Sequence, residues 1–141
     1  MAKSGRYSAD RKKIETLTGA KTVEVHDCGT IFILNANGGG EVTLPNASAA
    51  GNGWWGKFVL GLKNAGGAWN INATAADGNN MHNVVVDEAG GNEDSHGGTA
   101  GDLIAFTANT GEIGCQVEVV TDGSKWYCLS HSNATGAITS D

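Results

Sequence analysis

Short apolar segments separated by glycine, asparagine or aspartate recur about every ten residues along this chain from Lys21 onward. The 22 glycines and single proline indicate many tight turns, several of which need a positive φ. No segment shows a sustained helical period, and residues 46–50 are long enough for one helical turn only. The spacing predicts an all-β fold, either an antiparallel barrel or a jelly-roll-like sandwich, with strands at 22–26, 30–35, 41–44, 55–62, 68–73, 81–87, 102–107, 114–121, 125–131 and 136–139.

A length of 141 residues suits one domain with a substantial core. We expect an extended basic arm over residues 1–16, followed by a single β domain over residues 17–141. No stretch approaches 18 consecutive apolar residues, which argues against a membrane partner. Three cysteines cannot all pair within one chain, so Cys28, Cys115 and Cys128 are expected to be free, buried thiols.

The clearest single element is a hairpin predicted over residues 117–129. Valine and threonine alternate with Glu118 and Val120 in its first strand, a period of two that is typical of a half-buried strand. The pair Asp122-Gly123 then supplies the left-handed backbone that a tight reversal needs, and an aromatic strand follows it. This hairpin belongs in an antiparallel β domain.

The hairpin and three upstream segments together resemble the head decoration (cement) proteins of tailed bacteriophages. The resemblance is carried, in order, by D-C-G-T-I-F-I-L-N-A at 27–36, E-V-T-L-P at 41–45, G-D-L-I-A-F at 101–106, D-G-S-K-W-Y at 122–127 and G-A-I-T at 136–139. The chain departs from the family pattern at Cys28 and in the Gly/Asn/Asp-rich insert at 88–100. The resemblance implies a homotrimer, made in the host cytoplasm, that binds the major capsid protein on the outside of the virion and needs no cofactor.

Two predicted strands are apolar on both faces. These are residues 30–34 and, apart from Lys57, residues 55–62. Such strands lie centrally in a sheet, with one face in the core and the other face covered by something else. In so small a domain the cover can be a neighbouring subunit, which favours an oligomer independently of the family resemblance.

Charge is distributed unevenly between the N-terminus and the rest of the chain. The first 15 residues carry a net charge of +3 and the remainder carries −9, which together give the chain its −6. A basic arm on an acidic body indicates docking to an acidic protein surface, with nucleic acid or a frayed, solvated terminus as alternatives. We expect no specific nucleic acid partner. The residues of the expected capsid-docking arm are Lys3, Arg6, Arg11, Lys12 and Lys13.

One segment matches part of a nucleotide-binding motif. Residues 51–57 read G-x-x-x-x-G-K, the opening of a phosphate-binding loop. Phe58 stands where a magnesium-binding hydroxyl belongs, and a strand pattern follows in place of a helix N-terminus. The segment therefore does not predict a phosphate site.

Residues suited to metal binding or catalysis occur without the spacing those sites need. His26, Asp27 and Cys28 would point to alternate faces of a strand and cannot converge on one ion. The acidic run at 87–94 is expected to be a solvated loop, with opportunistic cation binding as the alternative. Ser95-His96 and Ser130-His131-Ser132 come without a nucleophile elbow. We expect no catalytic, cofactor-binding or metal site, and no enzymatic activity.

The tryptophans separate the two main functional hypotheses. Anchors in the core or in a subunit interface fit a cement protein, whereas exposed rings along a groove fit a carbohydrate- or receptor-binding module of a phage tail fibre. Trp69 is weighed between these two roles together with Trp54, Trp55 and Trp126. The cement hypothesis is the one we carry forward. The side chains that it assigns to the core or the subunit interface are Ile31, Ile33, Trp54, Trp55, Phe58 and Trp126.

Overall fold

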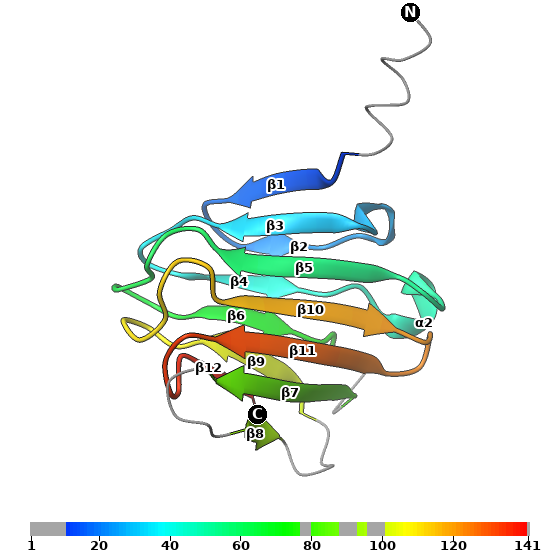
Figure 1. Ribbon diagram of the computed structural model, residues 1–141. Coiled ribbons are helices and arrows are strands. Elements are labelled where there is room, and N and C mark those ends of the chain that lie inside the picture. Colours follow the sequence, from blue (N-terminus) through cyan, green and yellow to red (C-terminus); the bar gives the residue numbers. More distant parts are fainter. Residues whose placement is uncertain (1–10, 77–79, 88–92, 96–100, 141) are drawn as a thin grey trace, which may run out of the picture.

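Two β-sheets pack face to face in the computed structural model of this protein, which describes residues 11–76, 80–87, 93–95 and 101–140 (Figure 1). The larger sheet consists, in spatial order, of β1 (Lys13–Leu17), β3 (Thr30–Leu34), β5 (Trp55–Leu60), β10 (Gln116–Thr121), β11 (Trp126–Ser132), β7 (Met81–Asp87) and β8 (Glu93–Ser95). The smaller sheet consists of β12 (Ile138–Ser140), β9 (Leu103–Phe106), β6 (Trp69–Asn72), β4 (Gly40–Thr43) and β2 (Lys21–Thr22). Figure 1 looks onto the larger sheet, with the smaller one behind it.

The chain changes sheet after every strand from β1 to β6. As a result β1, β3 and β5 lie parallel in the larger sheet, and β2, β4 and β6 lie parallel in the smaller one. The N-terminal half is therefore a flattened coil whose successive turns are hydrogen-bonded to each other. Two short helical segments, η1 (Val25–Asp27) and α2 (Ala47–Ala50), lead the chain back to the larger sheet. The side chain of Asn46 caps α2 by accepting a hydrogen bond from the Ser48 amide.

The C-terminal half completes both sheets mainly by antiparallel pairing. β10 lies antiparallel to β5 and to β11, and β9 lies antiparallel to β6 and to β12. β7 instead runs parallel to its neighbour β11. The predicted all-β sandwich is confirmed, and so is the hairpin around Asp122-Gly123, where Gly123 has φ +88°. The two sheets are mixed, however, because the coil of the first half requires parallel neighbours.

The core between the sheets follows from the alternation of side chains along each strand. Phe32 and Phe58 stack with ring centroids 5.1 Å apart, and Trp54 meets Trp126 edge to face at 5.4 Å. Both contacts lie on the inner face of the larger sheet. From the smaller sheet come Trp69, Ile71, Ile104 and Phe106, all fully buried. Burial of these large side chains provides most of the driving force for packing the sheets together.

Consecutive turns of the coil touch so closely that glycine is needed between them. A Cβ on Gly39, which has φ +71°, would lie 1.9 Å from the carbonyl oxygen of Ala68. A Cβ on Gly40 would lie 2.6 Å from the ring of Trp69. Gly38, the preceding residue, has open space around the same position. The G-G-G sequence at 38–40 therefore contains glycines with different structural roles.

The structure changes two expected boundaries near the N-terminus. Residues 13–16, expected in the arm, belong to β1, which pairs in parallel with β3. The strand expected at 22–26 stops at Thr22, because Glu24 and Asp27 form a capping box that turns the chain into η1. The short strand β8 lies within the predicted insert at 88–100, most of which is outside the described residues. Within the residues described, no helix is long and apolar enough to span a membrane.

Candidate interaction surface

The outward-facing residues of the larger sheet include many apolar side chains. Strand pairing aligns them in three rows across the sheet. We call this surface the outer apolar face and define it by Ile14, Ile31, Ile33, Trp55, Val59, Val84, Val86, Val120, Tyr127 and Leu129.

Exposed apolar side chains are concentrated on this face. Of the nine large hydrophobic residues that are exposed in the described chain, six belong to it. Ile14 is 62% exposed, Tyr127 46%, and both Leu129 and Val84 45%. Leu129 and Val84 are direct neighbours across the β11–β7 pair. Single exposed hydrophobic residues are ordinary on a protein surface, but five of these six adjoin one another on β10, β11 and β7. Such grouping is typical of interaction sites.

Polar residues interrupt the outer apolar face at Thr16, Lys57, His82, Gln116, Glu118 and His131. Lys57 on β5 stands directly opposite Glu118 on β10, near the middle of the sheet. Gln116 and His131 form another cross-strand pair in the adjacent row. At the rim, the Lys12 ammonium lies 5.7 Å from the centre of the Trp55 ring, within range of a cation–π contact. The face therefore carries one central basic and one central acidic side chain.

The outward surface of the smaller sheet has the opposite character. Asn70 and Asn72 each donate a side-chain hydrogen bond of 2.7 Å to the carboxylate of Glu41. Thr43 and Thr139 also project outward from this sheet, since Val42 and Ile138 beside them are buried. This sheet presents a hydrogen-bonded polar surface to solvent. The sandwich thus has one apolar and one polar outer surface.

A well-ordered turn borders the outer apolar face at one end. The carboxylate of Asp122 accepts hydrogen bonds from the amides of Lys125 and Ser124, both at 2.8 Å, and from the Tyr127 hydroxyl at 3.0 Å. The two amides, followed by the hydroxyl, lower the pKa of Asp122 and keep it ionised. The same bond raises the pKa of Tyr127. Tyr127, whose ring also stacks on His82 with centroids 6.2 Å apart, is therefore held in place.

Charged side chains close the sandwich at its β1 and β2 edge. Asp27 is almost fully buried, with Lys13 at 3.4 Å and Lys21 at 3.7 Å. Burial by itself would raise the pKa of Asp27, but the hydrogen bond from the Glu24 amide and the charges of both lysines outweigh it and lower the pKa. Lys21 also binds Glu15 at 3.0 Å, and this hydrogen bond is the main reason that the pKa of Lys21 is raised. The cluster is an ion-pair network.

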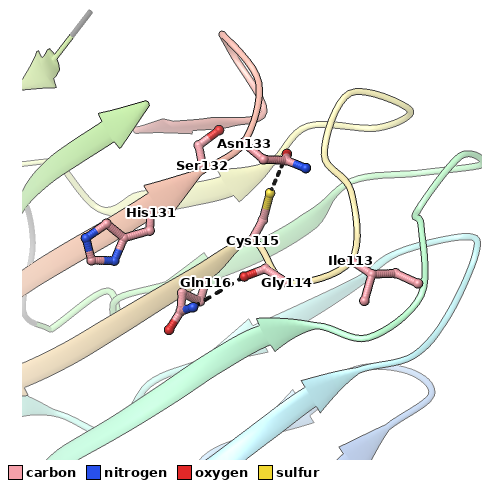
Figure 2. Close-up of a pocket in the computed structure, with 7 residues that line it drawn as sticks. All are labelled: Ile113, Gly114, Cys115, Gln116, His131, Ser132 and Asn133. Atoms are coloured by element: carbon pink, nitrogen blue, oxygen red, sulfur yellow. Dashed lines mark hydrogen bonds between the residues drawn. The ribbon is translucent and has the colours of Figure 1, made fainter. Parts of the chain in front are cut away.

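A shallow pocket of about 250 Å³ lies between residues 113–116 and 131–133 (Figure 2). Within it the Cys115 thiol donates a hydrogen bond of 3.0 Å to the side-chain oxygen of Asn133. His131 points away from that sulfur, as Figure 2 shows, so the pocket contains no thiol–imidazole pair. Ser130, which precedes His131 in the sequence, is buried, and its hydroxyl donates a hydrogen bond to the side-chain oxygen of Asn83. Among the described residues no group of three potential metal ligands comes together.

The structure divides the side chains predicted for the core or the interface into two sets. Trp54, Phe58 and Trp126 are buried in the core of the subunit itself, as is Trp69. Ile31, Ile33 and Trp55 are half-buried on the outer apolar face. Lys57 of the phosphate-loop match lies within β5, on the same face.

Three of the five predicted docking residues, Arg11, Lys12 and Lys13, are among the described residues. Lys3 and Arg6 lie outside the described residues, as does most of the acidic run at 87–94. Arg11 and Lys12 are exposed just before β1, whereas Lys13 belongs to the ion-pair network.

The expectation for the cysteines is corrected at Cys28, which is exposed at the end of η1. Cys115 and Cys128 are free and buried, and burial raises the pKa of the Cys128 thiol to about 12.

Sequence reasoning missed the contribution of β7 and β11 to the outer apolar face. Val84 and Val86 alternate with buried Met81, Asn83 and Val85, which is a readable two-sided apolar pattern. Tyr127 and Leu129 show the same pattern in β11. That these residues adjoin each other depends on the parallel pairing of β7 with β11, which no local sequence signal indicates.

Comparison with known proteins adds no further assignment, because no family model, no curated protein and no solved structure matches this chain.

Proposed function

We propose that this protein is a capsid decoration (cement) protein, a homotrimer that binds the outside of an icosahedral phage head and stabilises the lattice of the major capsid protein. The observation that carries the proposal is the contrast between the two outer surfaces of the sandwich. One is apolar over several strands, and the other is a polar, hydrogen-bonded surface. A rigid body with this contrast is suited to covering other protein surfaces while exposing one side to solvent.

The motifs that resemble decoration proteins support the proposal through their places in the fold. The D-G-S-K-W-Y segment forms the turn at Asp122-Gly123 and delivers Trp126 to the core. The segment at 27–36 supplies β3, at the centre of the coil, and the segment at 41–45 supplies most of β4. All three segments are structural, which fits a function that depends on association.

The mechanism is associative. A protein that binds the expanded lattice across several capsid subunits adds binding free energy to that state only, and so stabilises it by mass action. Contacts to several subunits at once raise the apparent affinity, because each later contact is intramolecular. The lattice then withstands a higher temperature or internal pressure before it opens.

The test is to locate the protein on virus particles. Particles of the phage that carries this sequence should show the sandwich as density on the outer surface of the head by cryo-electron microscopy. Particles lacking the protein should lose that density and release DNA at a lower temperature. Density confined to the tail fibres, or heads equally stable without the protein, would contradict the proposal.

The carbohydrate- or receptor-binding module remains the alternative, and one residue favours it. Trp55 is the only tryptophan among the four that is not buried, and Lys12 lies beside its ring. A glycan array of the wild-type protein compared with Trp55→Ala tests it. Selective loss of a glycan signal in a fully folded Trp55→Ala protein would favour the module over the cement protein.

A further inference from the structure

We infer that the outer apolar face is the surface through which copies of this chain pack against one another. The inference rests on the homotrimer included in the proposed function and goes further by naming the contact surface. Its core is formed by Leu129 and Val84, which are neighbours on β11 and β7. Ile14 extends the face to β1, and Val120 and Tyr127 extend it toward the Asp122 turn.

The size of the face suits a stable subunit contact. Strands are about 4.8 Å apart, and residues on one face recur about every 6.7 Å along a strand, so the three rows span roughly 500 Å² in projection. The accessible area of such a corrugated surface is larger than its projection. The projection alone is about 60% of the roughly 800 Å² that each partner contributes to a standard interface.

The charges on the face favour a second copy over a partner of one dominant charge. The adjacent residues Lys57 and Glu118 give the centre of the face one positive and one negative group. Around a threefold axis, Lys57 of each copy can therefore approach Glu118 of the next copy, so that every one of these charges has a partner. An acidic or a basic partner surface would leave one of these two charges without a counterpart and desolvated.

A decoration protein with this apolar face also needs the face covered before it reaches the capsid. A decoration protein exists free in solution before it binds the head, and during that time an apolar face of this size promotes aggregation. Copies of the chain are the partner that is always present at that stage.

Two matched leucines provide the test. Leu129, which is 45% exposed, lies on the outer apolar face. Leu62, which is 40% exposed, lies beyond the end of β5 and is not part of that face. Leu129→Glu should weaken self-association at least about 100-fold, because a carboxylate would be buried without a partner. Leu62→Glu should leave self-association unchanged. Sedimentation equilibrium measures the oligomeric state of both, and near-UV circular dichroism verifies that each is folded.

A second variant and a binding assay make the outcome decisive. Val84→Glu, in the same row of the sheet, should dissociate the oligomer as Leu129→Glu does, so the result does not depend on one side chain. A monomeric wild-type protein, or trimers that persist in both folded variants, would overturn the inference. Binding to heads is measured separately. Head binding without self-association leaves the decoration function standing, and self-association without head binding contradicts that function alone.

Discussion

At the scale of single residues, the fold depends on a few positions where the backbone of one coil turn touches the next. Gly39 combines a positive φ with a carbonyl oxygen 1.9 Å from where its Cβ would be. Gly38, its neighbour, has neither constraint. The two residues therefore form a matched pair in which the same substitution has different consequences.

Gly39→Ala should destabilise the protein by about 2–5 kcal/mol, because strain from the positive φ adds to a steric conflict with backbone that cannot move freely. Gly38→Ala should change the free energy of unfolding by less than about 0.5 kcal/mol. Urea unfolding monitored by tryptophan fluorescence measures both values. Equal effects of the two substitutions would show that the turns of the coil are not packed as described.

At the scale of elements, the sequence predicted which segments are strands better than it predicted how they pair. Short apolar segments between turn residues identified β3, β5, β7, β10 and β11, and in each of these strands every second residue is buried. Alternation carries no information on strand direction, so the parallel coil of the first half was not foreseen. β1 was missed for a physical reason. Its inward residues before Leu17 are Lys13 and Glu15, which reverses the usual pattern.

The candidate surface was predictable to the same degree. Two-sided apolar strands pointed to Ile31 and Ile33, and both lie on the outer apolar face. The partition of Trp54 and Trp55 between core and surface follows from the start of β5, which sequence alone places only approximately.

The ion-pair network at the β1 and β2 edge makes stability depend on pH. The pKa of Asp27 in the folded protein lies below its ordinary value of 3.8, so the ionised carboxylate stabilises the fold at higher pH. That contribution is lost as the pH falls from about 4 through the lowered pKa of Asp27. For Lys21 the sign is reversed: its pKa is raised above 10.5, and its contribution is lost as the pH rises through that raised value.

Asp27→Asn tests this dependence. The substitution should cost about 1–3 kcal/mol at pH 7, because the buried Asn would lose the charge-assisted bonds to Glu24, Lys13 and Lys21. The difference between wild type and variant should shrink as the pH is lowered from 5 to about 2, as the wild-type carboxyl also becomes neutral. Denaturant unfolding across that pH range gives the measurement. A difference that stays constant would mean that the charge of Asp27 contributes nothing.

At the scale of the whole molecule, the basic N-terminus can be separated from the sandwich at a sharper boundary than the sequence suggested. A deletion through residue 15 would remove part of β1 and both Lys13 and Glu15 from the ion-pair network. Deletion of residues 1–10 spares every strand among the described residues. It still removes Lys3 and Arg6, two of the five residues proposed to dock.

The protein lacking residues 1–10 should keep its melting temperature and bind phage heads more weakly. Rising salt should weaken binding of the full-length protein more than that of the truncated one, since exposed charges are screened beyond about 8 Å at physiological ionic strength. Sedimentation of heads with bound protein measures both effects. Equal occupancy of the two proteins at low and high salt would exclude the N-terminus as a docking element.

The charged edge of the coil also has a consequence for uncontrolled growth of the sheets. β1 and β2 end the parallel stack, and an open parallel edge is a template onto which further strands can add, as in fibrils. Lys13, Glu15 and Lys21, gathered around Asp27, lie where an added strand would have to bury apolar residues. Any such strand would have to desolvate these charges. The network therefore limits the length of the stack, and the protein can carry a broad apolar face without also polymerising from its end.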